Sequence, residues 1–265
     1  MITAGIDIGS TTSKAVILEE DTILGQVVQP SRILPSDSAH EVFEKCCAAN
    51  GIESSQVTAV AVTRYGRRLA KFGDLVITEI RACGLGAKLV DSPKGKIHTI
   101  IDVGGQDTKI ITLADDGSVE EFAMNDKCAA GTGRFLEMLA NKLELNYEEF
   151  VKAALQSDTM IQMNSTCTVF AESEVISLLA RGIDKNDIAA AVHNAIADRI
   201  GSMVRRVGQK EVVCFTGGGA RNLALTKALE GNLNKRLYIP DSPQTMIALG
   251  AALAAREKLK KRGVT

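Results

Sequence analysis

Short apolar runs alternate with longer amphipathic segments along most of this chain. Periodicity of about 3.6 residues predicts helices over residues 39–49, 78–90, 134–144, 170–181, 187–207 and 245–261. Runs of four to seven apolar or β-branched residues predict strands over residues 4–8, 14–18, 57–63, 98–103, 109–113 and 211–216. Interleaved strands and helices of these lengths indicate an α/β fold with two sheets.

One segment occurs twice, with a spacing of 102 − 7 = 95 residues. DIGSTTSK at residues 7–14 and DVGGQDTK at residues 102–109 share an aspartate, a glycine, a hydroxyl residue and a lysine at matching positions. Each copy follows one predicted strand and leads into another, which predicts a β-hairpin with glycine in its loop. The repetition predicts two homologous subdomains, residues 1–97 with 247–265 and residues 98–246.

These loops have the chemistry of a phosphate site. Backbone N–H groups at glycine, together with serine and threonine hydroxyls, suit phosphate oxygens, and an adjacent aspartate suits a magnesium ion held through water. A single D-x-G loop is better explained as an ordinary turn. The second copy with its matching lysine favours the functional interpretation.

A third glycine cluster, TGGGARN at residues 216–222, follows a predicted strand and begins a helix. Such a turn lets a ligand approach the backbone closely. The spacing does not fit G-x-G-x-x-G, and no G-x-x-x-x-G-K-[ST] segment occurs, so the dinucleotide-binding and P-loop motifs are both excluded.

Composition and net charge limit the classes of partner that the chain is expected to bind. The chain of 265 residues is 45% hydrophobic and 24% charged, with a formal net charge of −1. This balance predicts no nucleic-acid partner, and the longest apolar run, residues 246–255, is half of what a membrane span needs. We therefore expect a cytoplasmic protein without a membrane partner.

Two of the six cysteines stand in unusual surroundings. Cys128 lies in NDKCAAGTGRF and Cys167 in NSTCTVF, each shortly before a predicted helix, where free N–H groups and the helix dipole would favour a thiolate or an anionic iron-sulfur cluster. The residues alone leave open that both are small buried side chains. Four others are interpreted as packing residues: Cys46, Cys47, Cys83 and Cys214.

Two thiolates per chain are half of what a 4Fe-4S cluster requires. A two-fold homodimer that shares one cluster supplies the missing two, so the cysteine count favours a homodimer.

The three glycine segments, in this order, resemble the phosphate-1, phosphate-2 and adenosine motifs of the actin, sugar kinase and heat-shock chaperone superfamily. The resemblance implies a duplicated actin-like fold with ATP in a cleft between the halves, and implies a role for each matching residue. Asp7 and Asp102 would face Mg²⁺, and Gln106 could position the attacking water. The expected nucleotide contacts are Gly9, Ser10, Thr11, Thr12, Lys14, Gly104 and Gly105 for the phosphates, and Gly217, Gly218 and Gly219 for the adenosine.

The two cysteine segments make the resemblance more specific. NDKCAAGTGRFLE and NSTCTVFAESE are similar to the ATP-dependent activators of 2-hydroxyacyl-CoA dehydratases, a BadF/BadG/BcrA/BcrD-type ATPase family that includes subunits of benzoyl-CoA reductase. The resemblance implies that Cys128 and Cys167 bind one 4Fe-4S cluster per homodimer. It also implies that ferredoxin or flavodoxin supplies single electrons, which pass with ATP hydrolysis to an iron-sulfur dehydratase or reductase component.

Three alternatives remain at this stage. The nucleotide motifs alone permit a small-molecule kinase, although the chain has few residues to spare for a second substrate pocket. They also permit a non-catalytic nucleotide-binding regulator. Within the family, the electron acceptor could be a double-cubane cluster protein or a benzoyl-CoA reductase-type partner.

Overall fold

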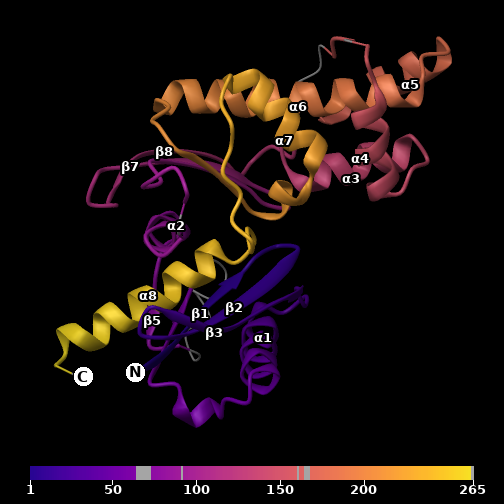
Figure 1. The fold of residues 1–265 in the computed structure, drawn as a ribbon. Coiled ribbons are helices and arrows are strands. Elements are labelled where there is room, and N and C mark those ends of the chain that lie inside the picture. Colours follow the sequence, from indigo (N-terminus) through magenta and orange to yellow (C-terminus); the bar gives the residue numbers. More distant parts are fainter. Residues whose placement is uncertain (64–72, 91, 160, 164–167, 264–265) are drawn as a thin grey trace. The chain divides into compact units, whose positions relative to one another are not determined.

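The computed structural model describes residues 1–63, 73–90, 92–159, 161–163 and 168–263. The chain divides into two compact units, the first formed by Met1–His98, Leu113–Glu121 and Pro240–Thr265, and the second by Thr99–Thr112 and Phe122–Ile239. Each unit contains β-strands with helices packed on them (Figure 1). The subdomain limits inferred from the sequence stay a prediction.

A five-stranded mixed sheet forms the centre of the first unit. Its strands are β1 (Ile2–Ile8), β2 (Thr12–Glu19), β3 (Thr22–Pro30), β4 (Ala59–Val62) and β5 (Leu75–Val76). Their order is β3-β2-β1-β4-β5, with β1, β2 and β3 antiparallel and with β4 parallel to both β1 and β5.

Alternating side chains of β1 serve the two faces of this sheet. On one face, Ile6 and Ile8 join the core under helix α1 (Pro35–Ala49). On the other face, Thr3 donates a hydrogen bond to the carbonyl of Ala252 in helix α8 (Met246–Lys261) at 3.1 Å, and α8 packs on helix α2 (Glu79–Ala87). A 3₁₀ turn, η1 (Ser54–Gln56), precedes β4.

A four-stranded sheet lies mostly in the second unit. Its strands are β6 (Thr99–Val103), β7 (Thr108–Leu113), β8 (Val119–Asn125) and β9 (Val213–Thr216), in the order β8-β7-β6-β9. The central strand β6 is antiparallel to β7 and parallel to β9. The connection from β8 to β9 contains the helices α3 (Gly133–Lys142), α4 (Tyr147–Gln156), α5 (Thr168–Ala180) and α6 (Lys185–Val207), and a 3₁₀ turn, η3 (Gly218–Arg221), leads from β9 into α7 (Leu223–Leu233).

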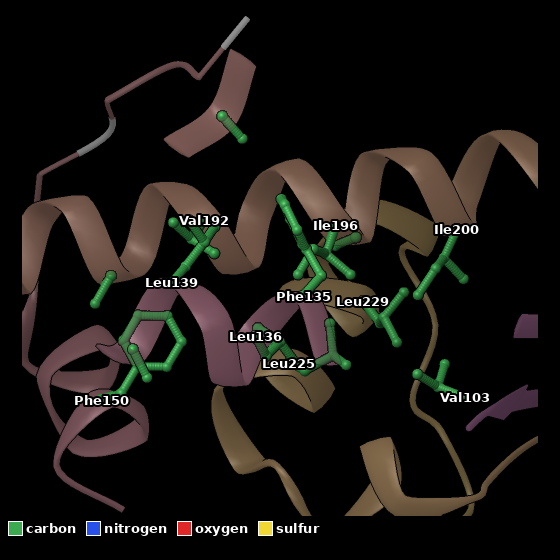
Figure 2. Close-up of a cluster of buried hydrophobic side chains, with 14 of the residues drawn as sticks. Val103, Phe135, Leu136, Leu139, Phe150, Val192, Ile196, Ile200, Leu225 and Leu229 are labelled. Atoms are coloured by element: carbon green, nitrogen blue, oxygen red, sulfur yellow. The ribbon is translucent and has the colours of Figure 1, made fainter. Parts of the chain in front are cut away.

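These helices give the second unit its own hydrophobic core. Side chains of α3, α4 and α7 converge beneath the long helix α6 (Figure 2). Each large apolar side chain that becomes fully buried stabilises the fold by about 1.5–3 kcal/mol relative to exposure. The buried side chains labelled there include Phe135, Leu139, Phe150, Val192, Ile196 and Leu225.

The predicted helices and the two glycine-containing hairpins are confirmed, whereas three strands and one α-helix among the described residues were not predicted. Strands β3 and β8 lie at sheet edges with many exposed residues, and β5 has only two residues, so their hydrophobic patterns are weak. Helix α4 had a readable signal, because Asn146 and Glu149 form a capping box. Among the described residues, no helix combines the length and apolar character that crossing a membrane requires.

Candidate active site

The first hairpin brings three polar side chains of the first unit together. Asp7 at the end of β1 is 1% exposed and lies opposite Lys14 of β2 in the strand register. Its Oδ2 atom is 3.2 Å from Nζ of Lys14, and its Oδ1 atom accepts a 2.6 Å hydrogen bond from the hydroxyl of Thr63. The carboxylate is thus held on both oxygens by groups from two neighbouring strands.

The second hairpin repeats this arrangement in the second unit. Asp102 of β6 lies opposite Lys109 of β7, and the Asp102 Oδ2 to Lys109 Nζ distance is 3.3 Å. The hydroxyl of Thr216 donates to Oδ1 of Asp102 at 3.1 Å. Lys109 differs from its counterpart because it is fully buried and also pairs with Asp107, at 2.9 Å.

Thr63 and Thr216 are the site residues that sequence reasoning missed. Each stands directly after or at the end of the strand that runs parallel to the aspartate strand, β4 in one unit and β9 in the other. A signal existed, since both predicted strands end in threonine. The structure extends the duplication from a hairpin motif to a set of aspartate, lysine and threonine.

The first glycine loop has a hydroxyl available for a ligand. The backbone N–H of Gly9 donates to the carbonyl of Thr12 at 3.0 Å, and the hydroxyl of Ser31 donates to the carbonyl of Gly9 at 2.7 Å. Within the described part of the chain, the buried Oγ of Ser10 has no hydrogen-bond partner. A buried, unsatisfied hydroxyl beside a glycine is consistent with a phosphate site. Thr11, the next residue of the loop, is exposed.

The second glycine loop is closed by a bond from the N–H of Gly104 to the carbonyl of Asp107, 2.8 Å long. Gln106 is exposed in this loop, as a water-positioning residue would need to be. The carbonyls of Gly104 and Gly105 accept bonds from the backbone N–H groups of Gly133 and Arg134, at 2.9 and 3.0 Å. The loop is therefore bonded to the first residues of α3.

The third glycine cluster has a packing role in addition to its predicted adenosine role. Gly217 has a φ of +82°, and a Cβ atom there would collide with the carbonyl oxygen of Val103. A Cβ on Gly219 would be 2.7 Å from Cβ of Val103. Both glycines are thus required by their closeness to β6, and Gly218 is exposed.

A buried histidine contacts the last residue of this cluster, Asn222. Asn222 caps α7 by accepting the N–H of Leu225 at 2.9 Å, and its Nδ2 lies 3.0 Å from Nε2 of His193. Nδ1 of His193 is 2.7 Å from the carbonyl of Ala189, so this nitrogen carries the proton and Nε2 accepts from Asn222. Burial lowers the pKa of His193 to about 4, although the bond to the Ala189 carbonyl favours the charged form.

The donor set around the aspartates fits magnesium held in the usual way. Proteins bind Mg²⁺ through one or two carboxylates while waters and substrate phosphates complete the shell. Each oxygen of Asp7 and Asp102 accepts a bond already, but a carboxylate oxygen has room for a second interaction. Within the described ranges, no group of three or more His, Cys, Asp or Glu side chains could hold a metal alone.

The described cysteines fall into two classes. Cys46, Cys47, Cys83 and Cys214 are buried, which confirms their interpretation as packing residues, and burial raises the pKa of both Cys46 and Cys214 to about 12. Cys128 is a free thiol that is partly exposed, as a cluster ligand would be. Cys167 lies outside the described residues.

The helix-dipole argument for Cys128 is not supported. Helix α3 begins at Gly133, five residues after Cys128, and the dipole effect is confined to the first turn. The N–H groups of Gly133 and Arg134 are bonded to the second glycine loop instead. The Cys128 segment is held in part by Asn125, whose Nδ2 donates to the carbonyls of Cys128 and Ala130 at 2.9 and 3.0 Å.

Each of the two units presents a hairpin loop with the same aspartate, lysine and threonine. This duplication is the defining feature of the actin-like ATPase folds. A ROK hexokinase from Thermus thermophilus has this fold with a TM-score of 0.57 at 17% identity, covering 98% of this chain and 100% of that one. The chain belongs to the BadF/BadG/BcrA/BcrD ATPase family, which it matches over residues 4–255.

Several relatives match this chain over nearly their whole length. The activator of lactoyl-CoA dehydratase from Anaerotignum propionicum is 40% identical, covering 99% of this chain and all of that protein. The solved activator of the 2-hydroxyisocaproyl-CoA dehydratase from Clostridium difficile, with bound ADPNP, has a TM-score of 0.91 at 39% identity, covering 99% and 97%. A subunit of benzoyl-CoA reductase from Thauera aromatica is 31% identical, covering 99% and 96%. The recognised family and its fold are thus confirmed.

Proposed function

We propose that this protein is an ATP-hydrolysing iron-sulfur activator that transfers single low-potential electrons to a 2-hydroxyacyl-CoA dehydratase in the cytoplasm. The proposal rests on one observation: the same chain contains two sets of aspartate, lysine and threonine and also a partly exposed thiol at Cys128. Support comes from full-length similarity to proteins that are themselves named dehydratase activators.

ATP and Mg²⁺ would be bound by the two glycine loops and their aspartates. Asp7 and Asp102 would hold the magnesium ion through its waters, and the hydroxyls of Thr63 and Thr216 would keep each carboxylate in one orientation. Lys14, with a side chain 13% exposed and one carboxylate partner, keeps donors for a phosphate. The exposed amide of Gln106 would orient the attacking water, and residues 217–219 would contact the adenosine.

One 4Fe-4S cluster per homodimer would be ligated by Cys128 and Cys167 of both protomers. The bound cluster supplies a one-electron carrier, which ferredoxin or flavodoxin would reduce. For one electron, about 59 mV corresponds to about 1.4 kcal/mol, so a gain of a few hundred millivolts requires roughly several kcal/mol, within reach of nucleotide hydrolysis. The protein itself would change the exposure of Cys128 when the bound nucleotide changes.

A second electron acceptor is favoured by a specific relative. Because the benzoyl-CoA reductase subunit is also similar, over 96% of its length, a second candidate acceptor is a reductase component of that type. A double-cubane cluster protein is a third candidate acceptor within the family. All three acceptors would depend on the same nucleotide and cluster residues of this chain. Mixing the reduced protein with each purified acceptor, and measuring which one becomes reduced, distinguishes these candidates.

The test is anaerobic purification followed by iron and sulfide analysis, sizing and electron paramagnetic resonance after reduction. We expect about four irons per dimer, lost in Cys128→Ser and in Cys167→Ser but kept in Cys83→Ser, together with ATP hydrolysis. The buried Cys83 is the matched control for a serine in place of cysteine. An iron-free monomer whose rate of ATP hydrolysis is unchanged by both substitutions would instead indicate a kinase. Bound ATP without hydrolysis would indicate a regulator.

A further inference from the structure

Thr108, the first residue of β7, connects the second glycine loop to the cysteine segment. It directly follows the loop, its side chain is 1% exposed, and its hydroxyl donates a 2.6 Å hydrogen bond to the carbonyl of Gly131. Gly131 is three residues after Cys128. Together with two backbone bonds, this side-chain bond links residues 104–108 to residues 131–134.

The other two bonds are made by the backbone. The N–H groups of Gly133 and Arg134 donate to the carbonyls of Gly104 and Gly105. Gly133 also packs closely, since a Cβ atom on it would be 3.3 Å from the carbonyl oxygen of Gly104. A displacement of residues 104 and 105 therefore acts directly on the chain that follows Cys128.

The cysteine segment, residues 125–133, is internally braced, so that it would move as one piece. Asn125 bonds to the carbonyls of Cys128 and Ala130, and the hydroxyl of Thr132 donates to the carbonyl of Ala129 at 2.6 Å. Gly131 has a φ of +90°, where only glycine is unstrained, and Arg199 packs against it.

The duplicated half of the molecule provides an internal comparison. Ser13 is the counterpart of Thr108, because the register pairs Ile8 with Ser13 in one hairpin and Val103 with Thr108 in the other. The hydroxyl of Ser13 lies 2.8 Å from that of Ser31, which bonds to the first glycine loop. The same position thus braces its own loop in the first unit and reaches the cysteine segment in the second.

We infer that Thr108 is a positioning residue that couples nucleotide at the second glycine loop to the exposure of Cys128. The inference rests on the proposed function in one respect, which is that nucleotide binds at this loop. Thr108 touches neither nucleotide nor cluster in this scheme; it transmits a shift of the loop through Gly131 to the braced segment.

The test compares Thr108→Val, Thr108→Ser and Thr99→Val with the parent protein. Valine keeps the shape and strand preference of threonine but removes the hydroxyl, and serine keeps the hydroxyl. Thr99 is a matched control, because it is buried at the far end of the adjacent strand and its hydroxyl also bonds to backbone, at Lys210.

Two readouts keep the coupling separate from the presence of a cluster. In iron-free full-length protein, the rate of Cys128 alkylation by iodoacetamide is measured by peptide mass spectrometry with Mg-ADP and with a magnesium complex of a non-hydrolysable ATP analogue. In anaerobically purified protein, iron loss to a chelator is measured with the same two nucleotides. The KM for ATP is recorded for every variant.

We expect the two nucleotides to give different Cys128 alkylation rates in the parent, in Thr108→Ser and in Thr99→Val. In Thr108→Val the ratio of the two rates should fall by about fivefold, as expected for a lost hydrogen bond of about 1 kcal/mol, with the KM for ATP unchanged. The same ratio in Thr108→Val as in the parent overturns the inference, as does an equal loss in Thr99→Val or a parent that shows no nucleotide effect. If the anaerobically purified parent contains no iron but its Cys128 alkylation still responds to nucleotide, the cluster proposal is contradicted and the coupling is supported.

Discussion

At the scale of single residues, the two lysines of the duplicated hairpins have diverged. Lys14 is partly exposed and pairs with Asp7, whereas Lys109 is fully buried and pairs with both Asp102 and Asp107. A buried ammonium between two carboxylates is costly to remove, because the acids would be left without a counter-charge in a poorly solvated site. We therefore predict a structural role for Lys109 and a phosphate-binding role for Lys14.

Substitution of each lysine by methionine should separate these roles. Lys109→Met should lower the free energy of unfolding by about 3–5 kcal/mol, the usual cost of removing one partner of a buried pair. Lys14→Met should lower it less and should raise the KM for ATP. Urea unfolding and steady-state ATPase assays measure both effects. Equal destabilisation by the two substitutions would contradict the assignment.

His193 predicts a specific dependence of stability on pH. Its folded-state pKa of about 4 lies below its ordinary value of 6.5, so the neutral ring is favoured by the fold. Above pH 6.5 the ring is neutral in both states and has no effect on the pH dependence. Below pH 6.5 the unfolded chain takes up a proton that the folded protein refuses, so stability falls by about 1.4 kcal/mol per pH unit until the pH reaches about 4.

The measurement is the urea unfolding free energy of the parent and of His193→Gln between pH 4 and pH 7.5. The variant should be less stable at pH 7.5, because the bonds to Ala189 and Asn222 change, but its stability should decline less steeply below pH 6.5. Parallel curves for the two proteins would show that His193 is not the titrating group.

At the scale of elements, α8 of the first unit lies unusually close to its neighbours. A Cβ atom on Gly250 would collide with the carbonyl oxygen of Ala82 in α2, and one on Gly86 would collide with that of Met246. A Cβ on Gly5 of β1 would collide with the carbonyl oxygen of Ala248. Glycine is used at these positions so that backbones can touch.

Two glycine to alanine substitutions in helices should therefore have opposite effects. Gly250→Ala should destabilise the first unit by about 1–3 kcal/mol, because α2 and α8 must separate. Gly231→Ala in α7, where a Cβ atom meets nothing within 4 Å, should be stabilising by about 0.5–1 kcal/mol through helix propensity. Thermal unfolding of both variants checks the signs, and a stabilising Gly250→Ala would refute the close packing.

At the scale of the whole molecule, the two units each have a core, a sheet and a glycine hairpin. A nucleotide that uses both hairpins should protect both units together. The ligand would stabilise the native state by about 2.7 kcal/mol at a concentration of 100 times its Kd.

Hydrogen exchange detects this protection. With Mg²⁺ and a non-hydrolysable ATP analogue, amide exchange should slow at residues 9–12 and at residues 104–107. Asp7→Asn and removal of Mg²⁺ by a chelator should each reduce the protection in both loops. Slowing confined to one hairpin would show that the nucleotide does not engage the duplicated set.

The sequence by itself determined the features that are local along the chain. The D-[IV]-G loops between short apolar runs dictate hairpins, because strand propensity and glycine tolerance act over a few neighbouring residues. The same local spacing placed Asp7, Lys14, Asp102 and Lys109, since partners across a short hairpin face each other. The cysteine segments were equally recognisable from their own residues.

Only the tertiary structure decided which distant groups complete these loops. Thr63 reaches Asp7 across 56 residues and Thr216 reaches Asp102 across 114, because parallel strands bring them together in a register that no local pattern encodes. The hydrogen bond from Thr108 to Gly131 also joins residues distant along the chain, at the place where the first residues of α3 are bonded to the second glycine loop. Hydrogen bonds between segments far apart depend on how whole elements pack, and that packing is a property of the folded chain.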